Sequence, residues 1–375
     1  MTKTKVCICG GGNLAHVTGG WLASRKNCEV SLLTRTPSLW ADDGIIRITD
    51  PGGKVFDAHI GLITSKPELA LKDADLVLLC LPGFAIADVL HSIAPCIDSK
   101  TAVGSIVSST GFFPMAQKIL PQGLELFGFQ RVPFIARINE YGHSASLLGY
   151  KDSLSVATFN SASPQRIADL LAKLFEVKVN LLGNPMMVTL TNSNPLLHPS
   201  RLFGIFGNGR STYDKPVLFY EEWDNFSSQT LIDCDNEFRR LLDRLDISRT
   251  DIPSILDYYE SHDAQSLTDK IRSIKAFKGL YAPMVKLEDG KYGPDWNNRY
   301  FTEDIPFGLM LIKSYASNYG IETPTIDKVL EWAQEGMDKE YLVNGQLTGS
   351  DLLHTVVEYI TSDNEFTSEY EGYNS

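Results

Sequence analysis

The 375-residue sequence has no run of about 18 consecutive apolar residues, the length that a membrane-spanning helix requires, so we expect no transmembrane helix. The N-terminus lacks an apolar stretch followed by a small-residue cleavage site, which argues against a secretory signal and favours the cytoplasm. Basic residues are outnumbered: 34 Lys and Arg face 46 Asp and Glu, and the net charge is −12. This balance argues against nucleic acid and against an anionic membrane as partners, because both bind basic patches.

Cysteines are few and scattered, and they form neither a C-x-x-C pair nor a His–Cys cluster. The sequence therefore predicts no metal site. Three of them lie in apolar runs that are typical of buried strands, where we interpret them as small hydrophobic side chains in a reducing compartment. The six positions are Cys7, Cys9, Cys28, Cys80, Cys96 and Cys234.

The length suits two domains better than one core. In the first half, short apolar runs alternate with helical segments, a pattern typical of strands buried on both faces of a parallel sheet. These runs cover residues 6–9, 30–33, 76–81, 102–107, 154–159 and 177–182. Residues 14–22 have helical apolar spacing, and residues 44–64 predict a hairpin around a Pro-Gly-Gly turn.

Strand-like runs end near residue 182, and helical stripes follow at residues 231–245 and 326–333. A threonine and a proline at residues 323–324 provide a helix start before the second stripe. We therefore predict an α/β protein: a Rossmann dinucleotide-binding domain over residues 1–182, followed by an all-helical domain over residues 183–375.

A glycine-rich turn, GGGNLA at residues 10–15, fits the pattern G-x-G-x-x-A between a strand and a helix. Gly10 permits the tight turn, Gly12 lets a pyrophosphate approach the backbone, and Ala15 lets helix and strand pack closely. Asn13 and Leu14 belong to the first helical turn, whose N–H groups attract phosphate. A turn required only for packing is the alternative.

The end of the second strand bears on the choice of cofactor. An NAD-binding domain usually has Asp or Glu there, to hold the ribose hydroxyls. Here Arg35 and Thr36 occupy this position, and no acidic residue occurs before Asp42. Arg35 can form paired hydrogen bonds to a 2′-phosphate, so we favour NADP(H), while NAD(H) stays open. A solvated loop arginine is the alternative.

Two later loops follow strands at their carboxyl ends, where ligands of open α/β sheets bind. One contains Pro82 and Gly83, and the other contains Thr110. We expect these three residues to line the cofactor pocket, with ordinary turn chemistry as the alternative.

Hydride transfer needs a proton donor and, for a carboxylate substrate, a cation. His198 lies in the segment TNSNPLLHP, and histidine is the residue type best suited to general acid–base catalysis near neutral pH. A hydrogen-bonded structural histidine is the alternative. A second segment, NRYFTEDIPFGL, places Arg299 and two acidic residues near a helix start. There the acids could serve the helix dipole alone, and Arg299 could pair with them.

These motifs resemble the opine dehydrogenases of the octopine/nopaline type. The resemblance is carried by the glycine turn, by the Asn194 to His198-Pro199 segment and, most specifically, by the segment from Arg299 to Leu309. A weaker match joins LFYE at residues 218–221 to D-x-E-x-R at residues 235–239. Together these motifs span residues 5–334.

The resemblance implies that the chain joins an amino acid to a 2-oxo acid such as pyruvate, through an imine that NADH or NADPH reduces to an N-carboxyalkyl amino acid. It implies that His198 is the catalytic histidine, that Asp304 pairs with it, and that Arg299 binds a substrate carboxylate. Asn194 is a candidate substrate contact, with backbone capping as the alternative. Tyr220 is a weaker candidate, for which helix packing is favoured.

Two other functions stay open. The 2-hydroxyacid, ketopantoate and glycerol-3-phosphate dehydrogenases have a similar layout and reduce a plain ketone. In enzymes of that kind a lysine donates the proton to the ketone. No lysine beyond residue 182 of this sequence lies in a motif that would support this role. A non-catalytic dinucleotide-sensing protein would keep the fold, although His198, Arg299 and Asp304 argue against it. For assembly we expect a homodimer, the commonest symmetric form.

Overall fold

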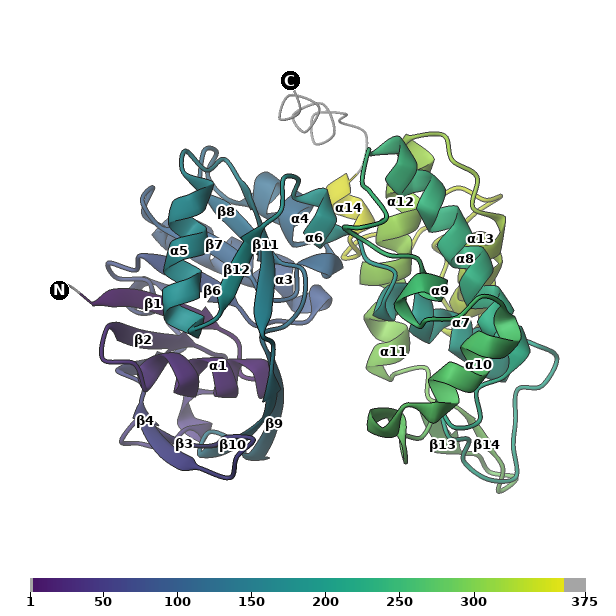
Figure 1. Ribbon diagram of the computed structural model, residues 1–375, viewed down its shortest axis with the longest axis horizontal. Coiled ribbons are helices and arrows are strands. Elements are labelled where there is room, and N and C mark those ends of the chain that lie inside the picture. Colours follow the sequence, from purple (N-terminus) through teal and green to yellow (C-terminus); the bar gives the residue numbers. More distant parts are fainter. Residues whose placement is uncertain (1–2, 361–375) are drawn as a thin grey trace. The chain divides into compact units, whose positions relative to one another are not determined.

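The computed structural model describes residues 3–360, which form two compact units (Figure 1). The first unit covers described residues up to Thr189, and the second begins at Leu190. The sequence placed this division after residue 182. The seven-residue difference includes a short helix, α6 (Met186–Thr189), which contacts strands of the first unit.

The main sheet of the first unit has eight strands in the order β12-β11-β8-β7-β6-β1-β2-β5. All six runs predicted as strands form part of it. Their apolar side chains are largely buried because helices cover both faces of the sheet, and those of the edge strand β12 are half-buried. The strands are β1 (Thr4–Cys9), β2 (Cys28–Leu33), β5 (Leu62–Thr64), β6 (Leu76–Leu79), β7 (Ala102–Ser105), β8 (Leu126–Phe129), β11 (Ser153–Phe159) and β12 (Lys178–Leu181).

Neighbouring strands of this sheet are parallel, except that β8 and β11 are antiparallel. The pattern typical of a parallel sheet is therefore met at every pair of this sheet except this one. Between β8 and β11 the chain leaves the sheet through β9 (Phe134–Glu140) and β10 (Ser144–Tyr150), and it returns in the opposite direction.

A second sheet has the order β4-β3-β10-β9. It contains the predicted hairpin, formed by β3 (Ile45–Thr49) and β4 (Val55–His59), and its turn is closed by a 2.9 Å bond from the Asp50 N–H to the Lys54 carbonyl. Strand β10 pairs with β9 and β3, so the excursion of the chain completes this sheet.

Helix α1 (Asn13–Ala23) contacts strands of both sheets, which explains why its residues from Ala15 to Gly20 are all buried. On the main sheet, α1 and α5 (Pro164–Phe175) lie on one face, and α3 (Gly83–Ile93) and α4 (Phe112–Ile119) lie on the other (Figure 1). A short helix, α2 (Pro67–Ala70), follows β5.

The second unit is helical, as predicted, with one addition: a hairpin of β13 (Met284–Lys286) and β14 (Tyr292–Pro294). The two predicted apolar stripes lie on α8 (Asn225–Arg244) and α13 (Pro324–Gly336), and Thr323 is the N-cap residue of α13. The other helices are α7 (Asn194–Phe206), α9 (Ile255–Tyr258), α10 (Ala264–Ser273), α11 (Arg299–Thr302), the π-helix η5 (Asp304–Leu309), α12 (Met310–Asn318) and α14 (Val357–Ile360).

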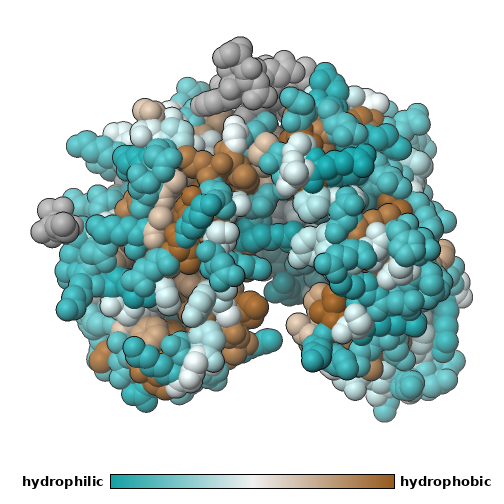
Figure 2. All heavy atoms as spheres, viewed as in Figure 1, coloured by the Kyte–Doolittle hydropathy of each residue, from teal (hydrophilic) through white to brown (hydrophobic). Residues whose placement is uncertain are grey.

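The surface of both units is mostly hydrophilic on the face drawn in Figure 2, with apolar side chains in separate patches. Among the helices of residues 3–360, none has both the length and the apolar character needed to span a bilayer. All six cysteines are free thiols, and five of them are buried, as the sequence indicated for Cys7, Cys9 and Cys80.

His16 joins the glycine turn to the second sheet. Its Nδ1 lies 3.0 Å from the Gly12 carbonyl, and its Nε2 accepts a 2.8 Å bond from the Gly142 N–H. The ring packs on Trp40 with 4.1 Å between centroids and is fully buried. Because Nε2 must accept, the imidazole is neutral with its proton on Nδ1. Burial lowers the pKa of His16 to about 4, and the Gly12 carbonyl only partly offsets this effect.

Stability should therefore fall as the pH drops from 6.5 towards 4, because the unfolded histidine binds a proton that the folded one does not. A depression of this size corresponds to about 3 kcal/mol over the window. In His16→Gln, urea unfolding measured across this pH range should show a shallower loss than wild type. The matched variant His91→Gln, at an exposed position on α3, should keep the wild-type slope. Equal slopes for all three proteins would contradict the assignment.

Candidate active site

The glycine turn has the geometry that a pyrophosphate needs. Gly10 has φ +137°, and a Cβ there would lie 2.6 Å from the Cys80 carbonyl oxygen, so both conformation and space require glycine. At Gly12 a Cβ would meet nothing within 4 Å, and no side chain caps the N-terminus of α1. The first N–H groups of the helix therefore face open space, where an anion can accept their hydrogen bonds.

The remaining residues of the motif have distinct places. Asn13 is exposed at the helix start, and its Oδ1 accepts a 2.8 Å bond from the Ile138 N–H, which ties β9 to the turn. Leu14 is half-buried, and Ala15 is fully buried in the core of the unit. The motif thus combines an open backbone edge with a closely packed helix.

Arg35 and Thr36 lie just beyond β2, and both are exposed. Within residues 3–360, the Arg35 guanidinium has neither a hydrogen bond nor an ion pair. The Thr36 hydroxyl lies 3.0 Å from the Tyr141 hydroxyl. Tyr141 was not anticipated from the sequence. It comes from the β9–β10 turn, and its hydroxyl lies so close to Gly11 that a Cβ there would be 2.5 Å away. Only the three-dimensional pairing of β10 with β3 brings it to this place.

The two later loops also follow strands of the main sheet. Pro82 and Gly83 lie after β6, at the N-terminus of α3, which has no side-chain cap. Thr110 lies after β7 and is 7% exposed, and its hydroxyl donates a 3.3 Å bond to the Val107 carbonyl. These loops place Pro82 and Gly83 at a helix N-terminus, whereas the Thr110 side chain is bonded within its own turn.

In the second unit, His198 and Asp304 are brought together although 106 residues separate them. Nδ1 of His198 lies 2.7 Å from Oδ2 of Asp304, and the two side chains are 5% and 10% exposed. A carboxylate can only accept, so Nδ1 carries a proton and Nε2 is the basic atom of the neutral ring. The Tyr220 hydroxyl lies 3.2 Å from Nε2 and can donate to it.

Two features of the backbone create this contact. His198 lies in α7, next to Pro199, and Asp304 opens the π-helix η5. Pro306 has no N–H and cannot bond to a preceding carbonyl, which favours the wider helical turn. The π-helix packs so closely on α7 at Gly308 that a Cβ there would lie only 3.0 Å from the Pro195 Cβ. Close packing of the two helices thus sets the distance between acid and histidine.

Aromatic side chains surround the histidine. Tyr300 stacks on the His198 ring with 4.1 Å between centroids, and Phe219 meets the ring edge-on at 5.7 Å. Tyr220 in turn stacks on Phe277 at 4.0 Å. Burial raises the pKa of Tyr220 well above its usual value, and burial also raises that of Tyr300. Both phenols therefore stay protonated, and Tyr220 acts as a hydrogen-bond donor.

Sequence reasoning assigned Tyr220 mainly to packing and did not consider Tyr300. Their positions inside the two motifs of the resemblance, LFYE and NRYFTED, were the signals that could have identified them. No short sequence pattern predicts that these two segments both contact the ring of His198.

Arg299 and Asn194 are exposed, unlike the pair beside them in the sequence. Arg299 begins α11, and among residues 3–360 no carboxylate forms an ion pair with it, so the simple alternative of pairing with nearby acids does not occur. Asn194 begins α7, and its side chain makes no hydrogen bond within the described part of the chain. Both side chains are therefore available to a ligand.

Within the described residues, no group of three or more His, Cys, Asp or Glu side chains could hold a metal ion. The basic imidazole, its buried carboxylate and the exposed guanidinium are the groups that can act on a substrate.

An open phosphate-binding turn on a Rossmann sheet and a buried acid–histidine pair on a helical unit define a nicotinamide-dependent dehydrogenase. Comparison with known proteins narrows this class. Residues 181–337 match the family "NAD/NADP octopine/nopaline dehydrogenase, alpha-helical domain", and residues 6–130 match "Ketopantoate reductase PanE/ApbA".

Relatives cover nearly the whole chain. Octopine dehydrogenase of Pecten maximus is 33% identical over 383 residues, with 94% of each chain covered. Tauropine dehydrogenase of Arabella iricolor is 32% identical, with 93% of this chain and 95% of the relative covered. A structure of octopine dehydrogenase with NADH and L-arginine superposes with a TM-score of 0.86 at 30% identity, covering 99% of this chain and 98% of that one.

The chain belongs to the octopine/nopaline dehydrogenase family. It is an NAD(P)-dependent oxidoreductase that acts on CH–NH bonds and joins an amino acid reductively to a 2-oxo acid. The family match to ketopantoate reductases covers residues 6–130 only, although a solved structure of that family shares the fold over 89% of this chain at 15% identity. The relatives at 32–33% identity over nearly the whole chain are octopine and tauropine dehydrogenases, and they favour reductive condensation over reduction of a plain ketone.

Proposed function

We propose that His198 moves the protons of the condensation through its Nε2 atom. Nε2 takes a proton from the substrate ammonium, so that the free amine can attack the carbonyl carbon of the 2-oxo acid. The same atom returns a proton when the carbinolamine loses water and becomes the imine. The observation that supports this role most directly is the 2.7 Å contact between His198 and Asp304, since it keeps the other ring nitrogen protonated and leaves Nε2 basic.

Asp304 and Tyr220 position the ring in this proposal. The Asp304 carboxylate stabilises the imidazolium that forms in the first step, and the buried setting strengthens that interaction. Tyr220 holds Nε2 until the substrate amine arrives. Arg299 binds a substrate carboxylate with two parallel N–H···O bonds, which orients the imine carbon, and Asn194 supplies a further polar contact.

The cofactor fits the turn at residues 10–15 because space is open above Gly12 and the N-terminus of α1 is uncapped. Backbone groups of Gly12, Asn13 and Leu14 would hold its pyrophosphate, with Gly10 permitting the tight turn and Ala15 keeping the helix close. Pro82, Gly83 and Thr110 would line the neighbouring loops. The reduced nicotinamide, when bound, supplies the hydride that converts the imine to a secondary amine.

The activity is tested by a matrix of amino acids and 2-oxo acids, assayed with NADPH and with NADH. L-arginine and pyruvate belong in the matrix, since octopine dehydrogenase has been solved with each. We expect cofactor oxidation only when both an amine and a 2-oxo acid are present, and mass spectrometry should find the secondary amine. Oxidation at the same rate with the 2-oxo acid alone would refute the proposal.

The role of the acid–histidine pair is tested by Asp304→Asn. An amide cannot stabilise the imidazolium, so kcat should fall about 100-fold or more, while cofactor binding measured by fluorescence is retained. The control is Asp327→Asn, which removes a carboxylate paired with Lys313 at 2.7 Å elsewhere in the same unit. Turnover per folded molecule should be unchanged in the control. A loss in Asp304→Asn no larger than in the control would remove the pair from the mechanism.

We further propose that NADP(H) is preferred, with Arg35 and Thr36 meeting the 2′-phosphate. The support is Arg35, which lies where an NAD enzyme carries an acidic residue. Its guanidinium is exposed and is bonded to no other described residue. Octopine dehydrogenase has been solved with NADH and yersinopine dehydrogenase with NADP+, so relatives with this fold accept either form. The proposal therefore rests on Arg35.

In Arg35→Asp, the dissociation constant for NADPH should rise by about tenfold or more, because a carboxylate replaces the cation beside the phosphate. NADH should bind as well as before, or more tightly. Titration of cofactor fluorescence measures both. An equal loss of affinity for the two cofactors would contradict the preference.

For location and assembly we propose a cytoplasmic homodimer. Six free cysteines, five of them buried, suit a reducing compartment. A dimer is the commonest symmetric assembly, and size-exclusion chromatography with light scattering determines it directly.

A further inference from the structure

The motif D-x-E-x-R on α8 has no part in the chemistry at His198. Its first two members have structural partners. Asp235 accepts bonds of 2.7 Å from the Asn192 side chain and 2.9 Å from the Ile255 N–H. Glu237 accepts bonds of 2.7 and 2.9 Å from the Thr325 and Ile326 N–H groups at the start of α13. The third member, Arg239, has no comparable partner.

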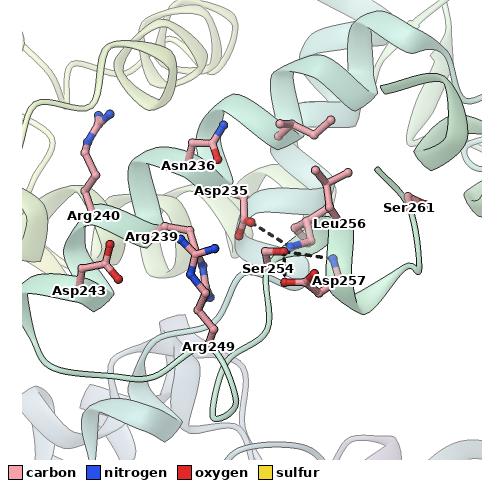
Figure 3. A pocket seen from close by; sticks show the side chains of 12 residues that line it. Asp235, Asn236, Arg239, Arg240, Asp243, Arg249, Ser254, Leu256, Asp257 and Ser261 are labelled. Atoms are coloured by element: carbon pink, nitrogen blue, oxygen red, sulfur yellow. Dashed lines mark hydrogen bonds between the residues drawn. The ribbon is translucent and has the colours of Figure 1, made fainter. Parts of the chain in front are cut away.

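Arg239 lines a pocket on the second unit with a volume of about 430 Å³ (Figure 3). The pocket is formed by α8, by the loop that follows it and by α9, and none of the residues placed around His198 contributes to it. Its charged lining residues are Asp235, Arg239, Arg240, Asp243, Arg249 and Asp257.

The Arg239 side chain carries a buried charge that is poorly satisfied. The residue is 5% exposed, its Nε has no hydrogen-bond partner, and its Nη2 reaches the Pro253 carbonyl only at 3.4 Å. Within residues 3–360, no carboxylate forms an ion pair with it. A buried cation without a counter-ion is costly, and folded proteins normally pair such groups. Burial accordingly lowers the pKa of Arg239.

Arg201 shows how the same unit treats a buried arginine that serves structure. It is 1% exposed, and its guanidinium donates to the Phe219 and Glu222 carbonyls at 2.8 and 2.6 Å and to Asp224 at 3.1 Å. Arg239 is nearly as buried, yet within the described residues it has no comparable set of hydrogen bonds and no ion pair. The two buried arginines of this unit therefore differ in how well their hydrogen-bond donors are satisfied.

A second arginine faces the same space. The guanidinium groups of Arg239 and Arg249 point toward one another (Figure 3), and the charge of Arg249 contributes to the lowered pKa of Arg239. Arg249 is exposed, and it has no ion pair with any described carboxylate. Two like charges that approach each other at the wall of a pocket repel, and an anion between them removes that repulsion.

We propose that this pocket binds a small oxyanion, a carboxylate or a phosphate group, between the guanidinium groups of Arg239 and Arg249. Both groups are planar donors that match the paired oxygens of such an anion. Three carboxylates line the pocket, Asp235, Asp243 and Asp257, and they attract Arg239 without an ion pair to it among the described residues. Asp235 is bonded to Asn192 and Ile255, and Asp257 accepts from the Ser254 hydroxyl at 2.6 Å. The site is separate from the substrate site proposed above.

The test is isothermal titration of the full chain with two probes, inorganic phosphate and succinate, at constant ionic strength set with chloride. We expect one binding event that Arg239→Met and Arg249→Ala each weaken about tenfold or more. Arg249 is exposed, so its replacement does not endanger folding. Arg244→Met, on the same helix but outside the pocket, should bind as wild type does. Anion binding at other sites appears equally in all variants and cancels in this comparison.

The tighter probe identifies the chemical class, phosphate or carboxylate. A second measurement, the temperature of unfolding, does not depend on ligand binding. In buffer without oxyanions, Arg239→Met should unfold at a temperature no lower than wild type, because an unsatisfied buried charge is replaced by an apolar chain of similar length. Arg201→Met should unfold at a lower temperature. Unchanged binding in both Arg239→Met and Arg249→Ala, an absence of binding at millimolar probe, or marked destabilisation by Arg239→Met would overturn the proposal.

Discussion

The contact between Asp304 and His198 is the constraint on which the catalytic unit depends. A carboxylate buried to this extent is tolerated because it accepts a hydrogen bond from a group that can carry the opposite charge. That bond settles which imidazole nitrogen is protonated, and so which one is basic. Tyr300 stacking and Phe219 edge contact keep the ring in this orientation. The chemistry of one nitrogen atom thus follows from packing on several sides.

The glycine turn at residues 10–15 is likewise held in place by contacts from elements around it. The turn must leave the first N–H groups of α1 uncapped, which removes one usual source of helix stability. Hydrogen bonds to neighbouring elements compensate for this loss. The Asn13 side chain accepts a bond from the Ile138 N–H, and the His16 ring bridges the Gly12 carbonyl and the Gly142 N–H. The second sheet therefore supports the phosphate-binding turn from outside the main sheet. This explains why α1 is buried on two sides instead of one.

How much was predictable from sequence depended on whether the determining interactions are local. The strand before Gly10, the start of α1 and the hairpin at residues 45–59 follow from short patterns of glycine, proline and alternating apolar residues, and all are present. The antiparallel return of β11 beside β8 depends on the path of the chain through a second sheet. The π-helix that carries Asp304, and the stacking of Tyr300 on His198, depend on contacts between segments about 100 residues apart. No local pattern encodes such contacts, and the resemblance to a family identified the pair by position only.

Buried charged side chains of the second unit differ in how they are satisfied. Two acidic side chains of α8 accept N–H groups at the starts of other helices: Asp235 accepts from α9 and Glu237 accepts from α13, where the helix dipole favours negative charge. Arg201 and Lys313 are buried cations with carboxylate partners at 3.1 and 2.7 Å. Arg239 lies one helical turn from Asp235, whose two oxygens are bonded to Asn192 and Ile255. Because no carboxylate of residues 3–360 forms an ion pair with this buried guanidinium, an anion from outside the described residues is the partner that the proposed oxyanion site supplies.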